Sequence, residues 1–74
     1  MIDKLRSIFA DSLGINIEDV NNGLTYAAIP EWDSVAHMAL IASIEEAFDI
    51  MIDTEDVIDM GDFTKAIQIV SKYL

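Results

Sequence analysis

The sequence contains no cysteine among its 74 residues. It therefore has neither a disulfide framework nor a zinc–thiolate site, and its composition does not indicate an oxidising or a reducing compartment. It also lacks a hydrophobic run long enough for the core of a signal peptide or for a bilayer-spanning helix. From these two absences we expect a cytoplasmic protein that does not insert into membranes.

Positive charge is also scarce, because only four Lys and Arg residues accompany fourteen Asp and Glu residues, which gives a net charge of −10 at pH 7. Nucleic-acid binding is therefore not expected, since phosphate backbones need neutralisation by Lys and Arg. The acidity instead favours partner proteins with basic surfaces. The length allows a single domain, residues 1–74, which we expect to be a monomer.

Hydrophobic residues make up 53% of the chain and recur at helical spacing in several segments. We expect helices over residues 3–13, 34–48 and 54–58 and from residue 63 onwards. Gly14 and Asp49 mark the ends of the first two helices, and Asp62 precedes the last one as a cap. The predicted fold is all-α, a small four-helix bundle of three longer helices and a short third helix, with a long first loop.

Helical periodicity fails between residues 15 and 32, where the sequence contains Asn21-Asn22-Gly23 and the single proline, Pro30. Its scattered aliphatic residues predict a long loop that packs onto the core, with one short helical turn near residues 18–20. Loops of this length in a small domain are usually functional or ordered by their own packing.

Asp33 and Ser34 lie where this loop meets the second predicted helix. An aspartate at this place accepts a hydrogen bond from a backbone N–H group of the first turn, so Asp33 is predicted to cap the helix. Ser34 is then its first residue, close to unpaired N–H groups and the positive end of the helix dipole. This position favours an attached or bound phosphate group.

Catalysis by this chain is not expected, and we assign no catalytic residue. The single histidine, His37, follows Ser34 by three residues, but a Ser–His hydrolase also needs an orienting acid and an oxyanion hole. Two side chains from one helical turn rarely converge in this way, so we expect His37 to face solvent or the rim of the bundle. We also expect no dedicated metal site, because the acidic residues between 53 and 62 do not match the spacing of an EF-hand loop.

The second predicted helix has two apolar strips. One suits the core: Leu40, Ile41, Ile44, Ala47 and Phe48. The other begins beside Ser34 and runs into two carboxylates: Val35, Met38, Ala39 and Ala42, then Glu45 and Glu46. Two interpretations are open: a central helix buried on several sides, or an exposed strip that docks against a partner with an apolar groove and a basic rim.

These residues resemble the acyl carrier protein family. The likeness rests on the run Trp32-Asp33-Ser34-Val35, on Ile44-Glu45-Glu46-Ala47-Phe48-Asp49 and on Ile52, and it extends to length, acidity and helix order. It implies that a phosphopantetheinyl transferase attaches 4′-phosphopantetheine from coenzyme A to Ser34, beside Asp33. The thiol of this arm would carry acyl groups as thioesters, which suits a chain without a thiol of its own.

The resemblance also implies which residues bind the acyl-loading and acyl-processing enzymes, namely Val35, Met38, Ala42, Glu45 and Glu46. The chain departs from the family where Val35 replaces leucine, where His37 and Ala39 replace polar or acidic residues, and where Trp32 replaces a small or aliphatic residue. These departures indicate a specialised, free-standing carrier of a fatty-acid or lipid, polyketide or related biosynthetic pathway.

Three further questions stay open at this point. The chain could be an aminoacyl or peptidyl carrier, or an acidic helical interaction module without a prosthetic group. The cargo could also fold back into the bundle, where the candidate lining residues are Phe48, Ile52, Ile58 and Phe63.

Overall fold

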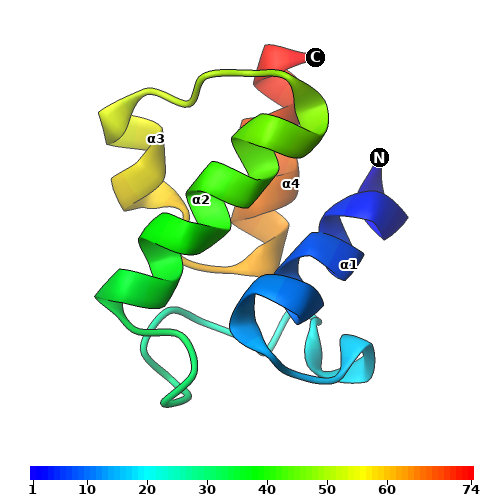
Figure 1. The fold of residues 1–74 in the computed structure, drawn as a ribbon, viewed down its shortest axis with the longest axis vertical. Coiled ribbons are helices and arrows are strands. Elements are labelled where there is room, and N and C mark those ends of the chain that lie inside the picture. Colours follow the sequence, from blue (N-terminus) through cyan, green and yellow to red (C-terminus); the bar gives the residue numbers. More distant parts are fainter.

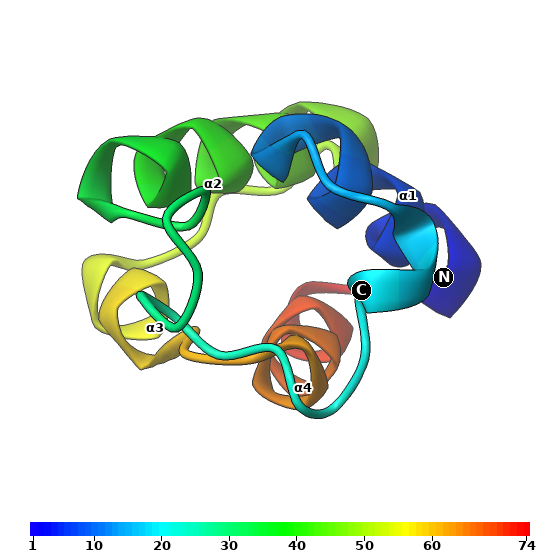
Figure 2. The ribbon, with the colours of Figure 1, turned by 90° about the horizontal axis from the view of Figure 1, so that it is seen from below.

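The computed structural model describes all 74 residues as a bundle of four α-helices and one 3-10 helix (Figure 1). In chain order these are α1 (Ile2–Leu13), η1 (Ile17–Asp19), α2 (Ser34–Phe48), α3 (Thr54–Asp59) and α4 (Phe63–Tyr73). The predicted all-α bundle with a short third helix and a long first loop is confirmed. Seen from below, α1 and α2 form one side of the bundle and α3 and α4 form the other (Figure 2).

The helix ends follow the local sequence signals. Gly14 ends α1 in the left-handed conformation (φ 67°), which glycine adopts without the steric penalty of a side chain. Asp62 caps the start of α4, where its Oδ1 accepts a hydrogen bond of 2.6 Å from the backbone N–H of Lys65. None of the helices combines the length and the hydropathy that crossing a bilayer requires.

Three aromatic rings form the centre of the core. The Phe9 ring meets the Trp32 ring edge-on at 5.5 Å and the Phe63 ring at 5.2 Å, and all three side chains are almost completely buried. Such edge-to-face contacts add to the free energy gained from burying apolar area. They join α1, α4 and the end of the first loop, so this loop is part of the core.

The long loop is held in place at several points, as the sequence predicts. Val20 and Leu24 are buried, and the predicted helical turn is the 3-10 helix η1. Thr25 forms an isolated β-bridge with Asp62, and the Tyr26 N–H donates a hydrogen bond of 2.8 Å to the Gly61 carbonyl. These contacts hold the backbone of Thr25 and Tyr26 against the connection between α3 and α4, and the Tyr26 ring packs on Trp32 and His37.

A polar cluster joins α3 to the end of α4. The Lys72 ammonium and the Tyr73 hydroxyl both donate hydrogen bonds to the Asp56 carboxylate. These two bonds hold the pKa of Asp56 below its usual value, and the same contacts raise the pKa of Lys72 and of Tyr73. Asp56 and Asp62, two of the acidic residues between 53 and 62, thus accept hydrogen bonds within the chain. No three or more His, Cys, Asp or Glu side chains are arranged so that they could hold a metal ion.

Candidate functional site

Ser34 is the first residue of α2, directly after the predicted cap. The Asp33 Oδ1 atom accepts a hydrogen bond of 2.8 Å from the Ala36 N–H, and the Asp33 carbonyl accepts one of 2.8 Å from the His37 N–H. The N–H groups of Ser34 and Val35 have no partner within the helix, because no helical carbonyl precedes them by four residues. The Ser34 side chain is exposed, so its hydroxyl group is accessible beside two free donors.

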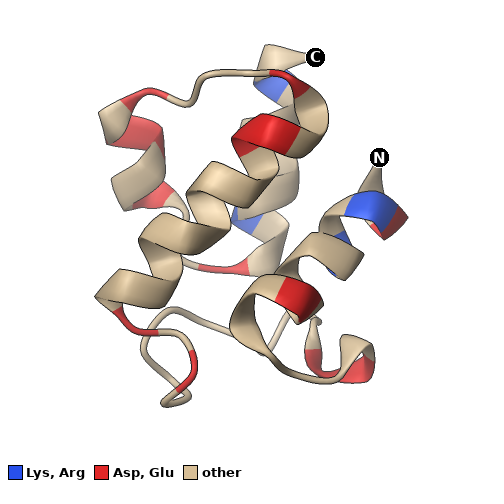
Figure 3. Ribbon diagram, viewed as in Figure 1, with Lys and Arg blue, Asp and Glu red and all other residues tan.

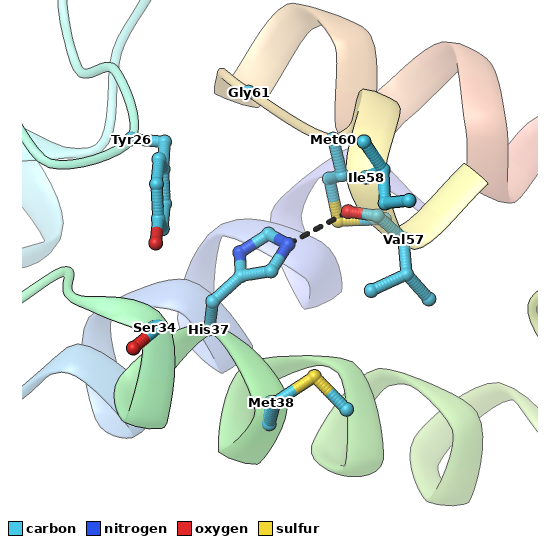
Figure 4. Close-up of a pocket in the computed structure, with 8 residues that line it drawn as sticks. All are labelled: Tyr26, Ser34, His37, Met38, Val57, Ile58, Met60 and Gly61. Carbon is cyan, nitrogen blue, oxygen red and sulfur yellow. Dashed lines mark hydrogen bonds between the residues drawn. The ribbon is translucent and has the colours of Figure 1, made fainter. Parts of the chain in front are cut away.

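Ser34 also lies at the rim of a largely apolar pocket of about 330 Å³ (Figure 4). The pocket is enclosed by the first turns of α2, the second half of α3 with the residues after it, and the long loop. Its lining residues are Tyr26, Ser34, His37, Met38, Val57, Ile58, Met60 and Gly61. An apolar cavity therefore opens beside the exposed hydroxyl.

Of the four residues expected to line a cargo cavity, only Ile58 lines this pocket. Phe63 packs on Phe9 in the core, and the Phe48 ring is covered by the Lys4 ammonium at 5.0 Å from its centroid. Ile52 is buried in the core cluster. The expectation was wrong for these three because the cavity lies at the N-terminal end of α2, whereas the interior near its C-terminal end is filled.

The expectation that His37 faces solvent or the rim is also wrong, because its side chain is only 9% exposed. The Trp32 Nε1–H donates a hydrogen bond of 2.9 Å to its Nδ1, and its Nε2 lies 2.8 Å from the Val57 carbonyl oxygen. An indole nitrogen can only donate, so Nδ1 accepts and the imidazole proton is on Nε2, which donates to Val57. The missed signal is the spacing of His37 to Leu40, Ile41 and Ile44, which places it on the core face.

These hydrogen bonds also determine what His37 cannot do. Both of its ring nitrogens are engaged, and Figure 4 shows the Ser34 hydroxyl directed away from the imidazole. A serine becomes a nucleophile in a hydrolase when an adjacent base accepts its proton. His37 therefore does not act as such a base for Ser34 in this arrangement.

The second apolar strip of α2 is exposed. Val35 is 77% exposed and Met38 is 59% exposed, and Ala39, Ala42 and Glu46 also face solvent. The buried residues of the helix are His37, Leu40, Ile41 and Ile44, all on the opposite face. The interpretation of a helix buried on several sides is therefore wrong, and the strip is a free surface that begins at Ser34.

Glu45 differs from its neighbour Glu46, because it is half-buried and bonded within the chain. Its Oε2 accepts a hydrogen bond of 2.9 Å from the Ile52 N–H in the connection between α2 and α3. This contact orders the connection after α2. Of the two carboxylates at the end of the strip, Glu46 is the one directed freely to solvent.

Most of the few basic side chains bond to groups within the chain itself. Lys4 donates to the Ala47 carbonyl at the end of α2, Arg6 donates to the Val20 carbonyl, and Lys72 pairs with Asp56. Acidic residues are spread along the surface, including the C-terminal end of α2 (Figure 3). The outward electrostatic field is therefore negative, as the net charge predicts.

Comparison with known proteins agrees with a phosphate group attached at the start of α2. A family model described as a phosphopantetheine attachment site matches residues 3–63. An acyl carrier protein of Desulforapulum autotrophicum is 40% identical to this chain over 70 residues, which cover 93% of this chain and 91% of that protein. The similarity thus extends over nearly the whole of both chains.

Proposed function

The chain belongs to the acyl carrier protein family, whose prosthetic group is 4′-phosphopantetheine, and we propose that Ser34 is the residue that carries this group. The observation that supports the proposal is the exposed Ser34 hydroxyl at the capped start of α2, on the rim of an apolar pocket. When attached, the group supplies the thiol that holds acyl groups as thioesters, which the chain itself lacks.

The residues around Ser34 fit a phosphate ester. The free N–H groups of Ser34 and Val35 and the positive end of the α2 dipole both favour negative charge at this place. Asp33 is the cap residue, and its Oδ1 accepts a hydrogen bond from the Ala36 N–H. This bond partly offsets the negative charge of the carboxylate beside the phosphate. The chain therefore orients the phosphate, while the pocket beside it is suited to apolar groups.

The exposed strip of α2 is the proposed docking surface for partner enzymes. Val35, Met38 and Ala42 supply apolar contacts next to the arm, and Glu46 supplies a free carboxylate. Glu45 has an indirect part in this proposal, because its carboxylate is bonded to the α2–α3 connection. The partners are a phosphopantetheinyl transferase and acyl-loading and acyl-processing enzymes, whose basic surfaces the negative field of this chain would attract.

We place this carrier in a fatty-acid or lipid, polyketide or related biosynthetic pathway, in the cytoplasm with its partner enzymes. The pocket supports an acyl cargo, because its walls are mainly hydrocarbon and offer few groups to bind the charged ammonium of an aminoacyl cargo. The carrier itself performs no catalysis in this proposal, in line with the engaged nitrogens of His37.

The test is incubation of the purified chain with a phosphopantetheinyl transferase and coenzyme A, followed by mass spectrometry of the intact protein. We expect the mass to increase by one phosphopantetheine in the wild type and in Ser7→Ala, a control at an exposed serine on α1. The Ser34→Ala variant should stay unmodified. A wild type that several transferases leave unmodified, or modification that persists in Ser34→Ala, would overturn the proposal.

A further inference from the structure

The hydrogen bonds of His37 connect the two walls of the pocket beside Ser34. The imidazole belongs to α2, and it donates from Nε2 to the carbonyl of Val57 in α3. Its ring is stacked against Trp32 at 5.9 Å, and the Tyr26 ring meets it at 5.2 Å with an interplanar angle of 69°. Aromatic neighbours and two hydrogen bonds thus restrict this ring to one orientation.

Helix α3 needs such a contact because little within its own sequence stabilises it. It has only six residues, its cap residue Asp53 makes no side-chain bond to the first turn, and Ile58 is 76% exposed. Helices this short are unstable without tertiary contacts. Within a longer helix the Val57 carbonyl would accept from the N–H of Gly61, but that N–H donates to Asp59 instead. His37 therefore supplies the donor that the end of α3 lacks.

The other end of α3 is held by α4. The Tyr73 hydroxyl accepts a hydrogen bond of 3.0 Å from the Asp53 N–H and donates to Asp56, which also pairs with Lys72. None of these residues lines the pocket. The two ends of α3 are thus attached separately, and the bond to His37 is the one at the pocket (Figure 4).

We propose that His37 is a positioning residue that holds α3 as one wall of the pocket beside Ser34, and so determines how well the pocket shelters an apolar cargo. The part that concerns cargo rests on the proposed function of Ser34. The part that concerns α3 does not, because it follows from the contacts of the unmodified chain.

The first measurement uses the wild type alone. Imidazole ¹⁵N NMR at pH 7.5 should find the His37 proton on Nε2, with a scalar coupling across the hydrogen bond to the Val57 carbonyl. A proton on Nδ1, or a doubly protonated ring at this pH, would overturn the assignment, because Nδ1 would then not accept from Trp32.

Two substitutions then separate the two bonds. In His37→Asn the amide oxygen replaces Nδ1 and can still accept from Trp32, whereas the donor to Val57 is lost. In His37→Gln the amide nitrogen replaces Nε2 and can still donate to Val57, whereas the acceptor for Trp32 is lost. Each variant loses one hydrogen bond of the same imidazole, the buried one to Trp32 in His37→Gln and the part-buried one to Val57 in His37→Asn.

Amide hydrogen exchange of the unmodified proteins gives the outcome. We expect exchange in α3 to become about two- to tenfold faster in His37→Asn, which corresponds to the loss of one net hydrogen bond, with α1 and α4 changed less. In His37→Gln, exchange in α3 should stay close to that of the wild type. Equal acceleration of all helices, or the same α3 exchange in both variants, would overturn the proposal.

The cargo part is tested on chains loaded with an octanoyl thioester from octanoyl-coenzyme A by the transferase. Hydrolysis frees the only thiol of the molecule, so a thiol reagent reports it directly. We expect faster hydrolysis in His37→Asn than in the wild type and in His37→Gln, and equal rates in all three would overturn this part. A chain that the transferase does not load contradicts the proposed function of Ser34, and leaves the exchange result to be judged on its own.

Discussion

Removing the cap of α2 should destabilise the protein and disturb the start of the helix where Ser34 lies. In Asp33→Ala the Ala36 N–H loses its partner, a hydrogen bond of 2.8 Å in the structure. Loss of such a cap costs about 1 kcal/mol, within a range of about 0.5–2 kcal/mol. A 74-residue domain has a free energy of unfolding of about 4–11 kcal/mol, so the loss is a considerable fraction of the total. The thermal midpoint should fall by about 4–8 °C for each kcal/mol.

The Asp33→Asn variant keeps the hydrogen-bond acceptor of the cap and removes its negative charge. Asparagine caps helices about as well as aspartate does, so this variant should stay within about 0.5 kcal/mol of the wild type. Both variants are measured by urea and thermal unfolding followed by circular dichroism. If Asp33→Asn loses as much stability as Asp33→Ala, the hydrogen bond to Ala36 is not the source of the effect.

The cap of α4 provides a control for function. Asp62 makes the equivalent bond to the Lys65 N–H at 2.6 Å, in a helix that does not carry Ser34. Asp62→Ala should therefore lose a similar free energy of unfolding while its rate of modification by the transferase stays near that of the wild type. Asp33→Ala should be modified more slowly, because the first turn of α2 frays. Equal rates in the two variants would refute the idea that the cap positions Ser34.

Three further predictions follow from charge. The pKa of Asp56 is lowered by its bonds to Lys72 and Tyr73, so these bonds contribute fully to the stability of the fold at a pH well above 3.8, the ordinary pKa of an aspartate. The contribution is lost as the pH falls below 3.8 and the folded protein takes up the proton. The thermal midpoint should therefore fall more steeply in the wild type than in Asp56→Asn as the pH drops below about 4, and parallel curves would contradict this. Added salt should raise the thermal midpoint at pH 7, because it screens the net charge of −10, and a flat or falling midpoint would count against this expectation. Glu46→Lys should slow association with a partner enzyme by about three- to tenfold at low salt, and more than Glu18→Lys, which changes the net charge equally on η1. Equal association rates for these two variants, measured by stopped flow, would place recognition elsewhere.

The order and ends of the helices could be predicted because their causes are local. Asp33 and Asp62 cap helices that begin at the next residue, and Gly14 adopts the left-handed conformation that ends α1. Hydrogen bonds of this kind join residues within one turn, so the sequence contains both partners close together. For the same reason the position of Ser34 at the start of α2 follows from the sequence alone.

From the sequence alone, the second apolar strip of α2 is compatible with two interpretations, a helix buried on several sides and an exposed docking surface. An apolar residue is compatible with both a core and a docking surface, and the sequence does not state how many neighbours pack against a helix. Val35 and Met38 are exposed because α1 packs on the other face of α2, from which His37 also bonds to α3, and nothing covers this one. The sequence places Glu45 on this strip but does not predict its bond to Ile52, because that bond crosses a connection whose path the sequence leaves undetermined.

The sequence by itself therefore determined the helices, the acidity, the place of Ser34 at the start of α2 and the absence of a thiol in the chain. The tertiary structure decided the surroundings of that serine. His37 has the helical spacing of a core residue, but a buried imidazole requires partners, and these are an indole five residues earlier and a carbonyl twenty residues later. Such partners are brought together only when the loop and α3 close over α2, since hydrogen bonds between distant segments depend on the packing of the whole chain.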